Sequence, residues 1–158
     1  MAVDAKVSQI DELTAYAGKM QGFMESVSGN CTALSNLMVQ KLDGLRKKLK
    51  KAEQMAAEAE AEYFALLDAM AKTANDDVEG RRALLAKKSF FENRKNMAKR
   101  MREMVSMQVV VAQGATSAII DGTKSFQNKL KDNVDKGQRV IKKSVGQLEQ
   151  YNETKKQL

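Results

Sequence analysis

Residues 42–70 read LDGLRKKLKKAEQMAAEAEAEYFALLDAM, and apolar residues recur in this stretch at alternating intervals of three and four. The repeat comprises Leu42, Leu45, Leu49, Ala52, Ala56, Ala59, Tyr63, Leu66 and Met70. This spacing is typical of a coiled-coil seam, in which the apolar residues of one helix face those of another. Small alanine side chains in the middle of the seam let two helices approach closely. The stretch therefore predicts a long helix that pairs with a second helix.

The second half of the chain repeats the same spacing. One set comprises Met97, Met101, Met104, Gln108, Val111, Ala115 and Ala118. A second set comprises Phe126, Leu130, Val134, Gly137, Ile141, Val145, Leu148 and Tyr151. We interpret both sets as the seam that faces the first half of the chain. No segment alternates with a period of two, so no sheet is expected.

Helix ends are harder to place, because the chain has no proline and only nine glycines. Clusters of Gly, Asn and Asp are the remaining stop signals. Ser28-Gly29-Asn30 is one such cluster, and 73–80 (TANDDVEG) is another, in which Asn75, Asp76 and Asp77 offer N-cap oxygens. Weaker interruptions occur at Gly114 and at Asp121-Gly122.

These signals predict helices at about 4–27, 31–73, 78–120 and 123–155 within one domain, 1–158. Since the seam runs across Gly114, we expect a bend or a continuous helix there. The predicted fold class is all-α, an elongated antiparallel bundle or coiled-coil hairpin of three to four long helices.

The charge is unevenly distributed along this basic chain, which has 27 Lys and Arg, 20 Asp and Glu, and a net charge of +7. Residues 52–80 sum to −7, and residues 81–102, directly after them, sum to +8. A hairpin about 73–80 would bring the two blocks together. The acidic set is Glu53, Glu58, Glu60 and Glu62, and the basic set is Arg94, Lys95, Lys99, Arg100 and Arg102. Each exposed pair contributes only ~0.2–1 kcal/mol, but several in register disfavour the opposite alignment.

Nucleic-acid binding through the same basic residues is the alternative interpretation. The aromatic residues do not support it, because none is interleaved with basic residues in a way that favours base stacking. Phe90 and Phe91 are adjacent, and we expect both in the core.

A separate basic cluster, Arg46, Lys47, Lys48, Lys50 and Lys51, would lie in the hairpin near 103–108, where Glu103 is the only acid. It is either a solvated helix face or a docking patch for an acidic partner or anionic lipid head groups.

The ten methionines also allow two interpretations. They fill an alanine-rich core, or they form an adaptable surface that binds a partner. Met20 and Met24, one turn apart, are the candidates for partner binding in the first helix. The exposure of the methionines discriminates between the two interpretations.

Most enzyme chemistry lacks its usual residues here. The chain has no His and one Cys, Cys31, so it has no imidazole base, no Cys-His or Ser-His-Asp nucleophile and no intrachain disulfide. Glu58 and Glu62 stand four residues apart, but bundle metal sites generally recruit carboxylates and His from several helices. The nine glycines are scattered and form no phosphate-binding loop. We therefore expect no enzyme activity, no metal and no cofactor.

The first 75 residues resemble the small helical-hairpin proteins of the WXG/LXG group, which belong to type VII secretion systems. The similarity lies in Ile10-Asp11-Glu12-Leu13, Tyr16-Ala17, Met20 and Phe23, and then in Leu42-Asp43-Gly44 and the run AEQMAAEAEAEY. The resemblance implies an all-helical protein that pairs with another helical chain and helps to deliver it.

The function expected from these features is a non-enzymatic helical adaptor that binds another helical protein, such as a type VII secretion toxin. The alternatives are a self-assembling coiled-coil scaffold or filament subunit, and a basic bundle that binds nucleic acid or an anionic surface. The N-terminus has no basic start followed by an apolar run, and the longest apolar run is Val109–Ala112. We therefore expect no transmembrane segment and a cytoplasmic protein, with any export independent of a cleaved signal peptide.

Overall fold

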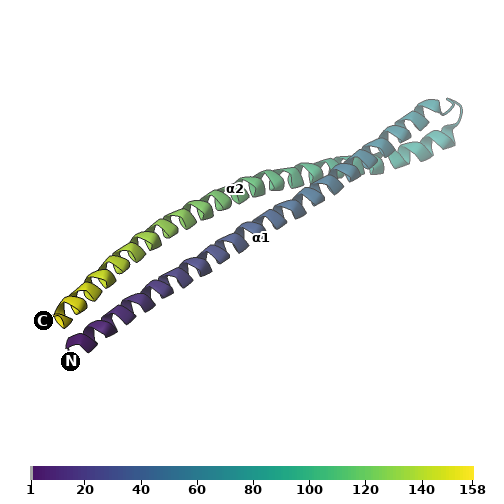
Figure 1. Cartoon of the computed structure of the whole chain (residues 1–158). Helices are drawn as coiled ribbons and strands as arrows, with labels where there is room; N and C mark the ends of the chain where they lie inside the picture. Colours follow the sequence, from purple (N-terminus) through teal and green to yellow (C-terminus); the bar gives the residue numbers. More distant parts are fainter. Residues whose placement is uncertain (1) are drawn as a thin grey trace. The chain divides into compact units, whose positions relative to one another are not determined.

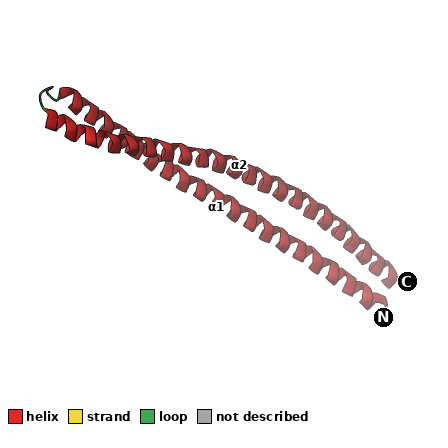
Figure 2. Cartoon of the chain, turned by 180° about the vertical axis from the view of Figure 1, so that it is seen from behind, coloured by secondary structure: helices red, strands yellow, loops and turns green. Residues whose placement is uncertain are grey.

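Two long helices make up the computed structural model, which describes the backbone of residues 2–158 and the side chains from Val7 onward. Helix α1 is Ala2–Lys72, with 71 residues, and helix α2 is Val78–Lys156, with 79 residues. They form an antiparallel hairpin through the short turn 73–77 (Figures 1 and 2). The prediction of an all-helical hairpin is confirmed, and the described residues contain no strand. The prediction of three to four helices is wrong.

Local hydrogen bonds explain why the chain turns at 73–77. Helix α1 ends where the Thr73 amide and hydroxyl both donate to the Ala69 carbonyl, at 3.1 and 2.8 Å. Asp77 is the N-cap of α2, because its Oδ1 accepts a hydrogen bond from the Gly80 amide at 2.9 Å. The Arg81 amide donates to the Asp77 carbonyl at 3.1 Å and starts the helical ladder.

The predicted break at Ser28-Gly29-Asn30 does not occur, because α1 runs straight through it. Glycine there has an ordinary negative φ, and the half-buried face continues from Met24 through Val27 to Cys31. The Ser28 carbonyl accepts hydrogen bonds from the hydroxyl of Thr32 and from Gln127 Nε2 of α2, each at 3.0 Å. A glycine inside a helix costs only ~1 kcal/mol, which the packing of a continuous face offsets.

The predicted boundary at 120–123 is also absent, since α2 continues through Gly114 and Gly122. This agrees with the continuity of the seam across Gly114. The Thr123 hydroxyl donates to the Ile120 carbonyl at 3.1 Å and stays within the helix.

The contacts between the helices divide the chain into two compact units. The hairpin unit is Met38–Ser117, and the terminal unit combines Met1–Leu37 with Ala118–Leu158.

The core of the hairpin unit uses the seam predicted for residues 42–70. Its buried apolar residues on α1 are Leu42, Ala52, Ala56, Ala59, Tyr63 and Leu66. The other seam positions of α1, Leu45, Leu49 and Met70, are half-buried. On α2, Val109 and Thr116 are buried. Three small alanines in the middle of the α1 seam therefore pack against α2, with larger leucine and tyrosine side chains on either side of them.

The terminal unit pairs residues 7–37 with 118–158 through a more polar interface. Val134 is its one buried apolar residue among those described. Gln138 Nε2 donates to Gln21 Oε1 at 3.3 Å, and the hydroxyls of Ser35 and Thr123 lie 3.2 Å apart. Polar side chains from both helices thus meet directly across this interface.

The seam predicted for α2 is correct in the terminal unit and wrong in the hairpin unit. Leu130, Val134, Gly137, Ile141, Val145 and Leu148 do lie on the buried or half-buried side, whereas Phe126 and Tyr151 are exposed. Between 97 and 118 the inward residues are each one position later than predicted. They are Ala98, Arg102, Val105, Val109, Ala112 and Thr116.

Candidate partner-binding surface

A row of large apolar side chains on α2 is exposed beside the interface with α1. Met97, Met101, Met104 and Val111 have 69%, 50%, 54% and 72% of their surface exposed. With Gln108 they keep the spacing of four and three, and Phe90, seven residues before Met97, is 65% exposed. We call Phe90, Met97, Met101, Met104, Gln108 and Val111 the outer stripe. It has the spacing of a coiled-coil seam, on a helix whose other apolar face packs against α1.

The expectation that Phe90 and Phe91 are both in the core is half right. Phe91 is half-buried, whereas Phe90 is exposed, and the two rings touch edge to face with centroids 5.5 Å apart.

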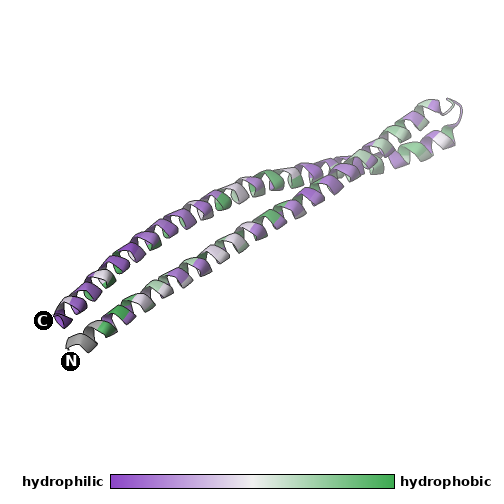
Figure 3. Ribbon diagram, viewed as in Figure 1, coloured by the Kyte–Doolittle hydropathy of each residue, from purple (hydrophilic) through white to green (hydrophobic). Residues whose placement is uncertain are grey.

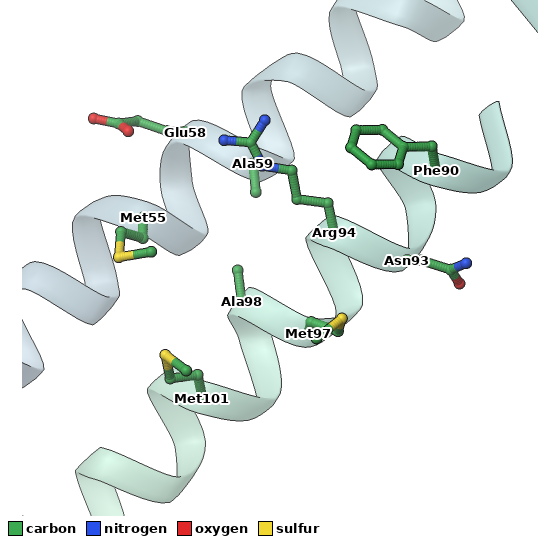
Figure 4. A pocket seen from close by; sticks show the side chains of 9 residues that line it. All are labelled: Met55, Glu58, Ala59, Phe90, Asn93, Arg94, Met97, Ala98 and Met101. Carbon is green, nitrogen blue, oxygen red and sulfur yellow. The ribbon is translucent and has the colours of Figure 1, made fainter. Parts of the chain in front are cut away.

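Part of the outer stripe forms one wall of a groove of about 490 Å³ between the two helices (Figure 4). Met55, Glu58 and Ala59 line it from α1. The lining from α2 is Phe90, Asn93, Arg94, Met97, Ala98 and Met101. Apolar side chains and sulfur atoms dominate this first groove, and Glu58, held by a 3.1 Å hydrogen bond from Gln54, stands at its edge.

A second groove, of about 730 Å³, continues along the same stripe within the hairpin unit. Leu45 lines it from α1. The lining from α2 is Arg100, Glu103, Met104, Met107, Gln108, Val111 and Ala112. Figure 3 shows hydrophobic residues recurring along α2 among hydrophilic ones. The two grooves together expose an apolar strip that a further helix could cover.

The basic cluster lies in the hairpin unit, beside this strip. Leu49, which sits within the cluster, shares a cleft with Glu103, Ser106 and Met107 of α2. All five cluster residues are exposed. Among the described residues, the only ion pair that involves the cluster joins Arg46 to Asp43 at 3.7 Å.

The opposing charge blocks flank the helix interface of the hairpin unit, with one direct ion pair among the described residues. Arg94 Nη1 lies 2.9 Å from Glu62 Oε2, and Lys95 Nζ lies 4.2 Å from the centre of the Tyr63 ring. Glu60 lines a cleft with Lys95, Lys99 and Arg102, and Glu53 shares another with Arg102. Glu58 and Arg94 both line the first groove, and Arg100 lines the second.

Met20 and Met24 face inward in the terminal unit, where both are half-buried. A Cβ on Gly137 would lie 2.6 Å from Met20 Cε, so the Met20 tip occupies the space that this glycine leaves. Among the methionines whose side chains the structure describes, the exposed ones are instead the four of α2 and Met55.

Helix α2 contains an 18-residue window with the length and composition to cross a membrane, and 11% of that window is buried. Its apolar character comes from residues 104–120, which include no charged side chain. Gln108, Gln113 and Thr116 interrupt this stretch, so it is apolar on average rather than continuously. The absence of a transmembrane segment stays a prediction.

No group of three or more His, Cys, Asp or Glu in the described part of the chain is placed to hold a metal ion. Cys31 is a free, half-buried thiol. No family model matches this chain, and no curated protein or solved structure matches it.

Proposed function

We propose that the chain is a non-enzymatic helical adaptor that binds a helix of another protein along the outer stripe. The observation that carries this proposal is the exposure of three methionines of the stripe, Met97, Met101 and Met104, by 50–69%, with the exposed Met107 beside them. A contiguous exposed apolar patch marks an interaction site more often than an isolated exposed residue does.

The spacing of the stripe favours a helix as the bound element. Intervals of four and three keep a row of side chains on one face of a helix, where a second helix can insert its own apolar residues. Methionine suits such a surface because its unbranched side chain repacks against differently shaped partners.

A more specific role is as a partner or targeting factor for a type VII secretion toxin. Its support is the sequence resemblance of the first 75 residues to WXG/LXG proteins. The hairpin of this chain turns at 73–77, outside the Ser28-Gly29-Asn30 segment at which the resemblance would place a turn. In this role the chain would pair with a helical region of the toxin and accompany it to the secretion machinery.

A self-assembling scaffold would cover the stripe with a second copy. In the antiparallel arrangement centred on Met101, Arg100 of one copy would face Arg100 of the other, which like-charge repulsion disfavours. Nucleic-acid binding through Arg94 and Lys95 would compete with their contacts to Glu62 and Tyr63.

Site-specific photo-crosslinking in cells of the source organism tests the adaptor role. A benzophenone amino acid would replace Met101 in the stripe or, as the control, the exposed Ala61 of α1, which points about 120° away from Met55. We expect position 101 to crosslink to one defined helical segment of another chain and position 61 to give no such product.

The captured segment, made as a peptide, should bind the purified chain and lose at least tenfold in affinity to the double variant Met97→Glu, Met104→Glu. Crosslinks from position 101 to this same chain would support the scaffold instead. The same crosslinked products from positions 101 and 61 would contradict specific binding along the outer stripe.

A further inference from the structure

We propose, building on the helix-binding role above, that the bound helix is amphipathic with an acidic flank. Lys48, Lys51 and Arg100 would form the basic rim that recognises it. The inference rests on how these three side chains are placed around the two grooves and on the absence of partners for them within the hairpin unit.

The position of the two lysines follows from helical geometry. Met55 lines the first groove and is about half exposed, so it marks the side of α1 that faces this groove. At about 100° per residue, Lys48 and Lys51 lie within about 40° of Met55 around the helix. Lys47 and Lys50 are turned from Met55 by about 80° and 140°. Lys48 and Lys51 are therefore the cluster lysines turned most nearly toward the side of Met55.

Arg100 completes the rim from the opposite helix, where it lines the second groove. Among the described residues, neither Arg100 nor the two rim lysines form an ion pair. Glu103 also lines this groove, so the rim carries one acid beside three cations. The hairpin unit as a whole has sixteen Lys and Arg against eleven Asp and Glu, which adds a long-range attraction for an acidic helix.

The stripe also sets the length of the partner. From Phe90 to Val111 it extends over 21 steps of about 1.5 Å, or roughly 32 Å. Three heptads of a partner helix cover that distance, with apolar residues at the seam positions and acids beside them.

Three designed peptides of about 24 residues provide the test on the full-length chain. The first has leucine at seam spacing with glutamate on its flanks, the second has lysine in place of the glutamates, and the third is the first in scrambled order. Fluorescence anisotropy of labelled peptide would measure the Kd at physiological salt. We expect binding of the first peptide, at least tenfold tighter than that of the second or the third.

The matched variants are Lys48→Glu, Lys51→Glu and Lys47→Glu, Lys50→Glu, which change the net charge equally. The rim variant should weaken binding of the acidic peptide about tenfold, and the control variant less than threefold, because the control lysines lie farther around α1 from Met55 than the rim lysines do. Circular dichroism would show that both variants remain helical. Equal losses of peptide affinity in the two variants would contradict the proposed basic rim.

The remaining outcomes separate this inference from the adaptor role. Equal binding of the acidic and basic peptides would overturn the charge preference and leave helix docking intact. Binding of the scrambled peptide as tightly as the ordered one would overturn docking of a helix. If none of the three peptides bound, both proposals would be overturned. This would hold whether the chain bound vesicles of anionic lipid instead or formed a dimer that covered its methionines.

Discussion

Replacing Val109 by alanine should destabilise the hairpin unit, whereas the same change at Val110 or Val111 should not. The three valines are consecutive in α2, yet Val109 is 8% exposed and its two neighbours are 67% and 72% exposed. They have the same side chain in the same helix and differ only in the direction in which they point.

The magnitude follows from the burial of each side chain. Alanine lacks two of the carbon groups of valine, each worth ~0.8 kcal/mol when fully buried, so Val109→Ala loses about 1.5 kcal/mol. The better helix propensity of alanine returns about 0.5 kcal/mol, for a net loss of about 1 kcal/mol, or more if a cavity remains. At Val110 and Val111 only about a third of the side-chain surface is buried. The loss of hydrophobic burial on replacement by alanine is therefore about as large as the gain in helix propensity, and the two cancel.

Urea unfolding followed by circular dichroism at 222 nm measures the difference. With a urea m-value of ~1–3 kcal/mol/M, a loss of 1 kcal/mol lowers the midpoint by roughly 0.3–1 M at constant m. The Val110→Ala and Val111→Ala midpoints should match that of the unmodified chain. If Val111→Ala were the costly change and Val109→Ala neutral, the outer stripe would face α1, and the proposed surface would not exist.

Three further changes test the capping, the core and the charge register. Asp77→Ala removes the acceptor of the Gly80 amide at the start of α2 and should lower the unfolding free energy by about 1 kcal/mol; an unchanged urea midpoint would refute the cap. Thr116→Val should raise thermal stability by about 1 kcal/mol, because the buried Thr116 hydroxyl has no hydrogen-bond partner among the described residues; a lower melting temperature would show that the hydroxyl is satisfied. Glu62→Gln should lose the half-exposed ion pair with Arg94, which is worth ~0.2–1 kcal/mol. A double-mutant cycle between Glu62 and Arg94 measures this coupling energy, and a coupling energy that stayed constant as salt was added would contradict the ion pair.

The sequence predicts α1 of the hairpin unit well and α2 poorly, for a physical reason. Between 42 and 70 only one face of the helix carries a continuous row of apolar residues, because Met55 and Phe64 stand singly off the seam, so the seam is unambiguous. Between 97 and 118 two faces carry apolar residues at the same spacing. One has the large residues of the outer stripe, and the other has smaller ones such as Ala98, Val105 and Ala112. Spacing alone would assign the larger side chains to the helix interface. In the structure, the face that packs against α1 is the one with the smaller residues.

The sequence signals predict too many helices, because glycine and asparagine also occur inside a helix and do not always end it. Gly29 and Gly114 carry a modest penalty inside a helix, and they end one only where the chain reverses or the packed face is lost. At 73–77 the capping oxygen of Asp77 and the loss of apolar spacing coincide, and the turn forms there. The candidate surface could be found in the sequence as a methionine-rich repeat. Its outward direction depends on packing between the helices, which composition does not encode.

Methionine oxidation of the purified chain, read by peptide mass spectrometry during mild peroxide treatment, most directly tests the solvent exposure of Met97 in the stripe and of Met107 beside it. Sulfur atoms react according to their access to solvent. Met97 and Met107, each 69% exposed, should convert to sulfoxide near the rate of free methionine, and half-buried Met20 and Met38 should react several-fold more slowly. Protection of Met97 and Met107 in the monomer, with faster oxidation of Met20 and Met38, would contradict a surface open to a partner helix.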